Sequence, residues 1–326
     1  MQSLTRRAFL GVAGAAGLVT VAACSSGNKT TTGQPSDVTI KHQFGETTIA
    51  APPKRVVSAG LTEQDDLLAL GVVPVAVTNW WGDQPFAVWP WAQPKLGSAR
   101  PAVLSLDDGF DFDKIKALKP DLIVAVNAGV DQDSYNRLTA IAPTIPQTSD
   151  SAFFEPWKEQ ATTIGQAVFQ ADKMKSLISQ AENKLTDVAD AHSQFKDKKA
   201  LLLQGSFVTD NLVATLGWRT GFLTQMGFVM PDGIGQFGVD DNRALIPRDK
   251  AVDALDAADV LIWTTDSDEQ QAALVADPTF AQLKSTASKR NVFTGKDLAG
   301  AIAFSSPLSL PFVADTLPPM IAKVIT

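Results

Sequence analysis

The sequence predicts an α/β fold of two similar lobes, each a mostly parallel sheet flanked by helices, joined by one long rigid helix. Residues 113–124 and residues 249–262 read alike, because each stretch has a short amphipathic helix, an aspartate and then a continuous apolar run. Apolar runs without polar alternation are typical of strands buried on both faces. Between these stretches, no proline occurs from residue 157 to residue 230, and a long helical stripe lies there.

The N-terminal lobe is predicted over residues 38–155 and the C-terminal lobe over residues 197–326. A second and weaker repeat supports this division. In each lobe an apolar run leads through a helix to a glycine, which is Gly71 in the first lobe and Gly227 in the second. Both glycines stand where a helix should end.

Residues 156–196 are predicted to form a helical connector region between the lobes. Apolar residues recur at steps of three and four from Ile164 to Val188, which places them on one face of a helix. The pattern allows one continuous helix, or two helices that meet near residues 169–171.

Composition and charge exclude several classes of protein. The chain has 326 residues, of which 45% are hydrophobic, so it can bury a substantial core. Its net charge of −7 argues against a nucleic-acid partner, which would require a basic face. One cysteine and two histidines are too few for a thiolate zinc site or a histidine-rich metal centre. We therefore expect no metal site and no intrinsic cofactor.

The start of the chain is predicted to direct export. Residues 1–23 combine the pair Arg6 and Arg7 with a short apolar run, which is typical of an export signal, and the pair resembles the twin-arginine motif. Residues 21–24 resemble a bacterial lipobox, which implies that Cys24 is lipidated. Residues 24–37 are then a flexible polar tether. We expect the chain to be anchored to the outer face of the cytoplasmic membrane.

A lipid-anchored, two-lobed α/β chain of this kind resembles the substrate-binding lipoproteins of ABC importers for ferric siderophores, haem and cobalamin. It most resembles the mycobacterial iron-uptake lipoproteins. The resemblance rests on the order and spacing of short motifs within residues 53–57, 70–77, 117–123, 141–144 and 277–283.

The resemblance implies a monomeric receptor, not an enzyme, which captures a ferric siderophore between its lobes and delivers it to an importer permease. A haem- or corrinoid-binding receptor of the same fold is the alternative. Less favoured are an extracytoplasmic enzyme that acts on siderophores and an envelope adhesin or sensor.

The most unusual segment is the aromatic loop, residues 79–93, which follows an apolar strand. It contains Trp80, Trp81, Phe86, Trp89 and Trp91. Loops at the carboxyl ends of parallel strands bind ligands in α/β sheets, and aromatic rings cover large, flat or apolar ligands. We expect this cluster to face a cleft, although some rings could instead pack the loop onto its own lobe.

Further candidates could face the aromatic loop or extend it. They are Arg100, Phe207, Trp218, Arg219, Arg243, Trp263 and Phe304. Arginine can stack on a ring and can also hold carboxylate or hydroxamate oxygens. The alternative for each arginine is a solvated side chain or a structural ion pair.

Asp113 and Asp249 occupy matching places in the two lobes. In the resembling family, an acidic residue at this place in each lobe, usually glutamate, docks into arginines of the permease. The resemblance therefore implies a docking role for both aspartates. The alternative is that each one caps the N-terminus of a helix.

Overall fold

The computed structural model describes residues 37–325. The predicted export signal, the lipidation site Cys24 and all but the last residue of the tether therefore lie outside the described residues. Within residues 37–325, no helix has both the length and the apolar composition that a membrane crossing requires.

The N-terminal lobe contains a five-stranded, fully parallel sheet with the strand order β5-β4-β3-β6-β7. Its strands are β3 (Val56–Ser58), β4 (Ala76–Thr78), β5 (Ala102–Leu104), β6 (Leu122–Ala125) and β7 (Thr144–Pro146). An antiparallel hairpin precedes them, formed by β1 (Val38–His42) and β2 (Gly45–Ile49). The helices are α1 (Glu63–Ala69), α2 (Gln93–Leu96), α3 (Phe112–Ala117) and α4 (Gln132–Thr139), with a 3-10 turn at Pro85–Ala87.

The C-terminal lobe contains a six-stranded sheet with the order β10-β11-β9-β8-β12-β13. Its strands are β8 (Ala200–Val208), β9 (Asn211–Thr215), β10 (Gly238–Asp240), β11 (Arg243–Pro247), β12 (Val260–Thr264) and β13 (Asn291–Phe293). The helices are α7 (Gly221–Gln225), α8 (Arg248–Leu255), α9 (Asp268–Ala276), α10 (Pro278–Gln282), α11 (Lys284–Ala287), α12 (Gly295–Phe304) and α13 (Ser309–Ala322). The 3-10 turns are Ser193–Phe195, Gly217–Thr220 and Ile234–Phe237.

The two-lobed α/β class is confirmed, but the second sheet is mixed and not mostly parallel. β8 pairs in parallel with β12, whereas its other neighbour, β9, runs antiparallel to it. Thr209 and Asp210 join β8 to β9 and both have positive φ angles, of 45° and 63°. A two-residue turn with positive φ at both positions matches the twist of a hairpin. The strand therefore turns back on itself where the sequence pattern predicted a helix.

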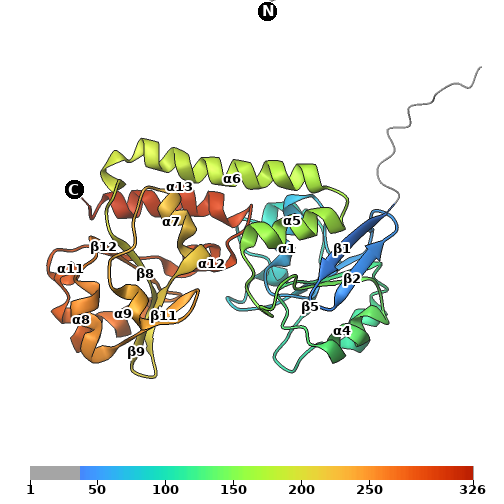
Figure 1. Cartoon of the computed structure of the whole chain (residues 1–326), viewed down its shortest axis with the longest axis horizontal. Helices are drawn as coiled ribbons and strands as arrows, with labels where there is room; N and C mark the ends of the chain where they lie inside the picture. The colour runs from blue at the N-terminus through green and yellow to red at the C-terminus, as the bar shows by residue number, and fades with distance from the viewer. Residues whose placement is uncertain (1–36, 326) are drawn as a thin grey trace, which may run out of the picture. The chain divides into compact units, whose positions relative to one another are not determined.

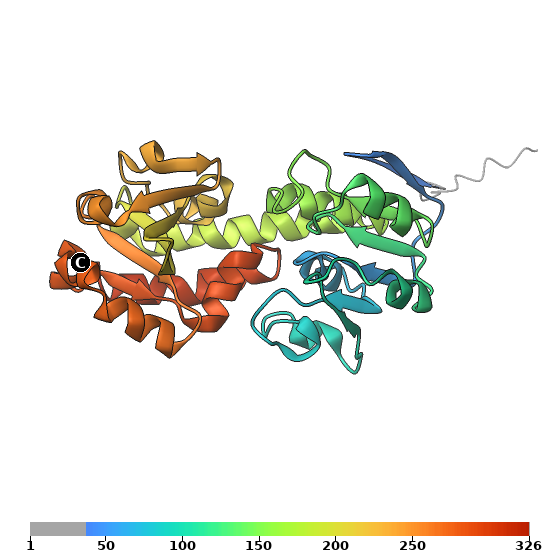
Figure 2. The same cartoon turned by 90° about the horizontal axis from the view of Figure 1, so that it is seen from below.

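Two helices, not one, occupy the predicted connector region. α5 (Trp157–Ala167) and α6 (Ala171–Ala191) are separated at Phe169, whose φ of 60° breaks the helical path. α6 has 21 residues and spans about 31 Å. Figure 1 and Figure 2 show it passing from one lobe to the other.

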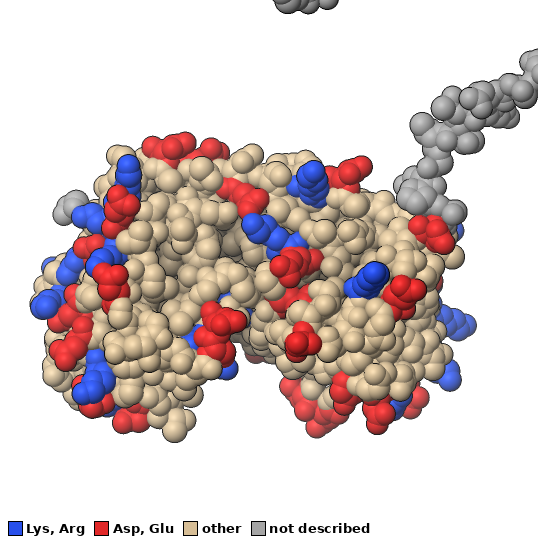
Figure 3. All heavy atoms as spheres, viewed as in Figure 1, with Lys and Arg blue, Asp and Glu red and all other residues tan. Residues whose placement is uncertain are grey.

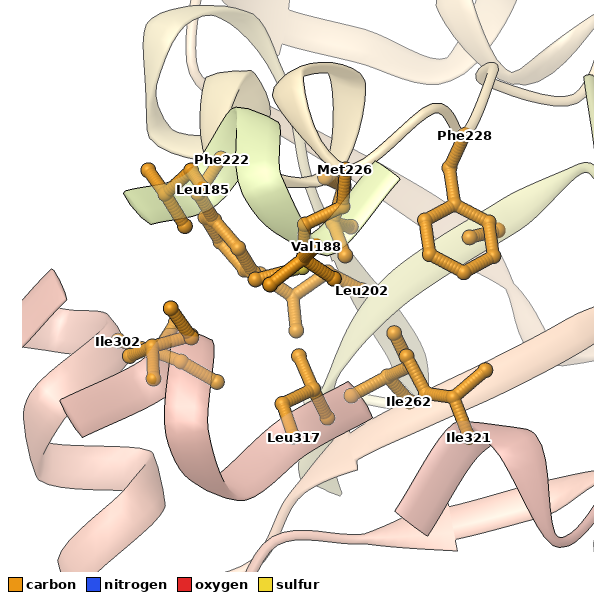
Figure 4. Close-up of a cluster of buried hydrophobic side chains, with 14 of the residues drawn as sticks. Leu185, Val188, Leu202, Phe222, Met226, Phe228, Ile262, Ile302, Leu317 and Ile321 are labelled. Carbon is orange, nitrogen blue, oxygen red and sulfur yellow. The ribbon is translucent and has the colours of Figure 1, made fainter. Parts of the chain in front are cut away.

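The apolar face of α6 is divided between two cores. Met174 and Ile178 pack in the core of the N-terminal lobe, together with residues of β3 and β6. Leu185 and Val188 pack in the core of the C-terminal lobe, where they meet side chains of β8, α7 and α13 (Figure 4). The helix is therefore a structural part of both lobes.

Candidate functional site

A cleft of about 270 Å³ lies between the lobes. Trp80 and Trp81 line it from the N-terminal lobe, in the loop that follows β4. The C-terminal lobe contributes Leu202, Gln204, Gly205, Ser206, Thr215, Arg219, Thr264, Asp266, Gln270, Ala299, Ile302 and Ala303. Figure 3 shows a hollow between the lobes at the lower edge of that view. The site lies at the carboxyl ends of β4 and β12, where parallel strands present ligand-binding loops, and beside residues 202–206 in the middle of β8.

An irregularity in β8 shapes the polar side of the cleft. The pairing of β8 with β9 shifts register between Leu203 and Phe207, so residues 204–206 bulge out of the ladder and line the cleft. A Cβ on Gly205 would lie 2.9 Å from the backbone oxygen of Thr264, so only glycine fits there. Bulges of this kind re-aim side chains beside binding sites.

Arg219 brings a positive charge to the cleft without an anionic partner. No carboxylate in the described part of the chain lies within ion-pair distance of it. Its guanidinium lies 4.6 Å from the ring centroid of Phe154 and 5.5 Å from that of Trp218. Burial, with repulsion from Arg243, lowers the pKa of Arg219 to about 10. The side chain therefore stays charged at neutral pH and remains available to an anionic group.

Asp266 brings a negative charge to the same cleft. Its carboxylate makes no ion pair within residues 37–325, while its backbone N–H donates to Oε1 of Gln270 at 2.8 Å. Because Arg219 and Asp266 do not pair with each other, the cleft offers two separate charged positions. A ligand with both an anionic oxygen and a cationic group would complement them.

The aromatic loop forms a cluster that reaches across to the other lobe. Trp80 and Trp81 lie edge to face with their ring centroids 6.2 Å apart, and the ring centroids of Trp81 and Trp89 are 4.9 Å apart. Trp89 stacks on Trp91 at 5.1 Å. Phe304 of α12 lies within 6.0 Å of Trp80, Trp89 and Trp91. The structure thus brings Trp80 and Trp81 to the cleft, while Trp89 and Phe304 hold the lobes together.

Trp89 is buried and does not line the cleft. Its side chain is 1% exposed and lies between Gly82 of its own loop and Gly300 of α12. A Cβ on Gly82 would lie 2.5 Å from the ring, and one on Gly300 would lie 2.6 Å from it. The ring therefore packs directly against backbone on both sides.

Several other predicted residues do not line the cleft. Arg100 is exposed and donates to its own backbone at Ala99, with Phe86 beneath it at 5.1 Å. Arg243 pairs with Asp240 at 2.8 Å. Phe207 lies under the guanidinium of Arg248 at 3.7 Å.

Trp263 lies in the core of the C-terminal lobe with 1% of its surface exposed. Its Nε1 donates to Asn291 at 3.0 Å. Successive side chains of β12 point to opposite faces of the sheet, so it is Thr264, at the end of the strand, that reaches the cleft.

Trp218 lines a second cavity, of about 200 Å³, between the start of α5 and the C-terminal lobe. Trp157 and Lys158 of α5 line the same cavity, and so does Arg219. Arg219 therefore lies between this cavity and the cleft. Lys158 is paired with Glu182 of α6 at 2.8 Å, which leaves Arg219 as the cation of this region without a carboxylate partner in residues 37–325.

Neither Asp113 nor Asp249 caps a helix. Asp111 is the residue that caps α3, where its side chain accepts from the backbone N–H of Lys114 at 2.9 Å. The N-cap of α8 is Pro247. Both predicted aspartates lie exposed in the first turns of α3 and α8, so the capping alternative is wrong and the docking role stays a prediction.

A group of buried acids in α1 was not predicted from the sequence. Glu63, Asp65 and Asp66 are each at most 1% exposed, and all seven residues of the helix are buried. Glu63 accepts from the backbone N–H groups of Asn127 and Thr62 at 2.7 and 3.0 Å. The available signal was their position, because the three acids begin the helix that follows the apolar strand β3, on the side of the sheet where ligand-facing loops lie.

Burial disfavours the charged form of all three carboxyl groups. It raises the pKa of Glu63 to about 7 and that of Asp65 to about 6. It also raises the pKa of Asp66 well above its ordinary value, and the neighbouring carboxyl groups of Asp65 and Glu63 add to that shift. Within residues 37–325, no group of histidine, cysteine or acidic side chains is arranged to hold a metal ion.

Known proteins share both the fold and the sequence pattern. A periplasmic solute binding protein from Mycobacterium smegmatis is 58% identical, with a TM-score of 0.84 over 89% of this chain and 99% of that one. PiaA of Streptococcus pneumoniae TIGR4, solved in complex with ferrichrome, shares the fold at 24% identity and a TM-score of 0.73, over 88% of this chain and 98% of that one.

A curated relative from Bacillus subtilis (strain 168), named "Probable siderophore-binding lipoprotein YfiY", is 28% identical over 66% of this chain. The match spans 65% of the relative's own length. The family model described as "Periplasmic binding protein" matches residues 56–298, which is more than half of the chain. The resemblance seen in the sequence is thereby confirmed, and the chain belongs to the periplasmic binding protein family.

Proposed function

We propose that this protein captures a ferric siderophore in the cleft between its lobes and delivers it to an ABC importer. The observation that carries the proposal is Arg219, a half-buried cation without an anionic partner in the described chain, which lines the cleft opposite Trp80 and Trp81. Hydroxamate, catecholate and carboxylate oxygens of an iron chelate are suitable partners for a guanidinium. The two indoles supply the apolar contact area.

The size of the cleft fits partial enclosure of the ligand. A volume of about 270 Å³ is just below the usual size of ligand pockets, which range from about 300 to 1,000 Å³. The cleft therefore holds one face of a chelate, and the rest of the ligand faces solvent. The iron arrives already enclosed by the chelator, so the protein supplies rings and charges and no metal ligands.

A haem-binding receptor is the alternative that the cleft favours less. None of the residues that line the cleft is a histidine, methionine, tyrosine or cysteine, which are the usual axial ligands of haem iron. The indoles would cover a flat macrocycle, but the unpaired Arg219 and Asp266 fit a polar chelate better.

Several further parts of the proposal concern the whole protein. We infer that the chain binds without catalysis, acts as a monomer, leaves the cytoplasm by twin-arginine export and is anchored through a lipid on Cys24. Asp113 and Asp249, exposed on α3 and α8, are the proposed contacts to the permease.

The test is a titration of the purified protein with ferrichrome, ferrioxamine B, haemin and cobalamin, followed by quenching of tryptophan fluorescence. Arg219→Gln should weaken binding of the ferric siderophore about tenfold to hundredfold, because one charge-assisted contact is lost. The matched control is Arg243→Gln, which removes an exposed and paired arginine. Binding of haemin alone, or equal affinity in both variants, would overturn the assignment.

A further inference from the structure

A buried hydrogen bond joins the two lobes beside the aromatic cluster. The hydroxyl of Ser306 donates to Oδ2 of Asp65 at 2.6 Å, across 241 positions of sequence. Asp65 lies in the first turn of α1, and Ser306 lies between α12 and α13. Both side chains are buried, with 0% and 1% of their surface exposed. The contact therefore lies inside the junction of the lobes.

The same oxygen of Asp65 also holds the aromatic loop. Nε1 of Trp91 donates to Oδ2 of Asp65 at 2.7 Å. Trp91 stacks on Trp89, and Trp89 in turn contacts Trp81, which lines the cleft. Trp80 and Trp81 form the aromatic wall of the cleft, and α12 lines the opposite wall. One carboxylate oxygen thus connects the aromatic wall to the loop that follows α12.

Within residues 37–325, no lysine, arginine or histidine forms an ion pair with Asp65. Its second oxygen, Oδ1, is buried and has no hydrogen-bond partner in the described chain. On α1 the ionisable neighbours are Glu63 and Asp66, and α5 meets Asp66 with the neutral amide of Gln160 at 2.8 Å. The two donors are Trp91 and Ser306, and no charged side chain lies near them in the sequence, within residues 89–92 or residues 305–309.

Two cations of neighbouring elements have other partners. Arg219 bonds to the carbonyl of Ala303 on α12, and Lys158 of α5 pairs with Glu182. A buried carboxylate that depends on two neutral donors is held in its charged form only by those donors. Removal of either donor, or uptake of a proton, changes how strongly Asp65 holds its partners.

We infer that Asp65 is a proton-sensitive positioning residue, which in its ionised form ties the aromatic wall of the cleft to Ser306 and so sets the binding geometry between the lobes. For ligand affinity, this inference rests on the proposed function. Burial raises the pKa of Asp65 to about 6, so the residue is ionised at pH 7 and neutral at pH 5. As the pH falls through this range, both hydrogen bonds lose their charge assistance, and affinity for the ligand should fall about tenfold.

The first experiment needs no ligand. Indole N–H signals in a ¹H–¹⁵N NMR spectrum of the whole protein are followed from pH 8 to pH 4.5, and the Trp91 signal is assigned with Trp91→Phe. The Trp91 signal should titrate with a midpoint near pH 6. Ser306→Ala should move that midpoint upward, because the remaining carboxylate has lost one donor.

Two controls separate Asp65 from its surroundings. Asp66→Asn changes the neighbouring buried acid, whose side chain accepts from Gln160 of α5, and should leave the Trp91 titration in place. Ser309→Ala removes the hydroxyl that accepts from the backbone N–H of Ser306 at 2.9 Å without touching Asp65. It should leave the midpoint unchanged, so a shift in Ser306→Ala alone reports the bond between the lobes.

The second experiment measures the affinity for ferrichrome and ferrioxamine B from pH 5 to pH 8 by fluorescence quenching. The wild type should bind about tenfold more weakly at pH 5, and Ser306→Ala should flatten this profile by weakening binding at pH 7. A Trp91 signal that does not titrate, or that still titrates in Asp65→Asn, would overturn the inference. If the wild type binds neither chelate at any pH, the proposed function fails, while the NMR titration still decides the role of Asp65.

Discussion

The indole of Trp89 packs against the backbone of Gly300, so closely that a Cβ at residue 300 would lie 2.6 Å from the ring. Trp89 belongs to the N-terminal lobe and Gly300 to α12 of the C-terminal lobe. The two lobes therefore meet through a large aromatic ring and a position that tolerates no side chain.

Gly300→Ala is the direct test of this contact. In an ordinary helix the change from glycine to alanine is favourable by about 1 kcal/mol. Here the added methyl group must displace the Trp89 ring, and overpacking of this kind costs about 1–3 kcal/mol. We expect a net loss of about 1 kcal/mol in the free energy of unfolding, measured by urea denaturation, together with a changed fluorescence spectrum.

The matched control is Gly221→Ala at the start of α7, where a Cβ would meet no atom within 4 Å. This variant should be as stable as the wild type or more stable. Equal behaviour of the two variants would show that the contact between Trp89 and Gly300 does not constrain the lobes.

The three buried acids of α1 give stability an unusual dependence on pH. The pKa values of Glu63, Asp65 and Asp66 are raised in the folded protein, so between about pH 4 and pH 7 the folded state binds more protons than the unfolded state. This contribution to stability is present in full at low pH and is lost as the pH rises. We expect the free energy of unfolding to be higher at pH 5 than at pH 8, on the order of 2 kcal/mol.

Urea denaturation at several pH values measures this slope. Asp66→Asn should flatten it, because one of the three groups no longer ionises. Asp113→Asn, an exposed acid on α3, serves as the comparison and should retain the wild-type slope. A protein that becomes steadily more stable from pH 5 to pH 8 would contradict the burial of uncompensated carboxyl groups.

Asp266 should determine the preference of the cleft for charged ligands. Its carboxylate lines the cleft and has no cationic partner within residues 37–325. Asp266→Asn should weaken binding of ferrioxamine B, which carries a free amine, by about two- to fivefold, and should leave binding of the uncharged ferrichrome unchanged.

Fluorescence titration of both chelates gives the two affinities. Asp268→Asn provides the control, since this exposed acid lies in α9 nearby but does not line the cleft. Parallel losses for both ligands in Asp266→Asn would show that the residue supports the fold of the cleft and does not select the ligand.

Variants of Asp111 and Asp113 test helix capping and permease docking separately, on one short helix. Asp111→Ala removes the cap of α3 and should cost about 1 kcal/mol of stability. Asp113→Ala should leave the urea midpoint unchanged and should reduce iron uptake in cells that depend on this receptor. Normal uptake with Asp113→Ala combined with Asp249→Ala would remove the proposed docking role.

The sequence predicts the framework of the fold well, because buried strands in α/β lobes are nearly continuous apolar runs. Leu122 to Ala125 and Val260 to Trp263 are all buried, as the pattern predicts. The hairpin between β8 and β9 was missed, because a Thr209-Asp210 turn lacks the glycine that usually marks such a turn.

The site was harder to predict than the fold. Trp80, Trp81 and Arg219 do line the cleft, and aromatic residues and arginines after strands stand out in the sequence. Trp263 was wrongly predicted to lie at the cleft, because the face of β12 to which its side chain points depends on the register of the strand. Asp65 was missed, since an acidic helix start reads as exposed, and its burial depends on Trp91 and on Ser306, far along the chain.

The division of α6 between two cores has a consequence for how the protein comes apart. Met174 completes one apolar interior and Leu185 completes the other, on a single uninterrupted helix. If either end of α6 melts, apolar side chains in the core of the lobe that it covers become exposed. Neither lobe is therefore a self-sufficient folding unit. Heating should accordingly produce one calorimetric peak, and each half expressed by itself should remain largely unfolded.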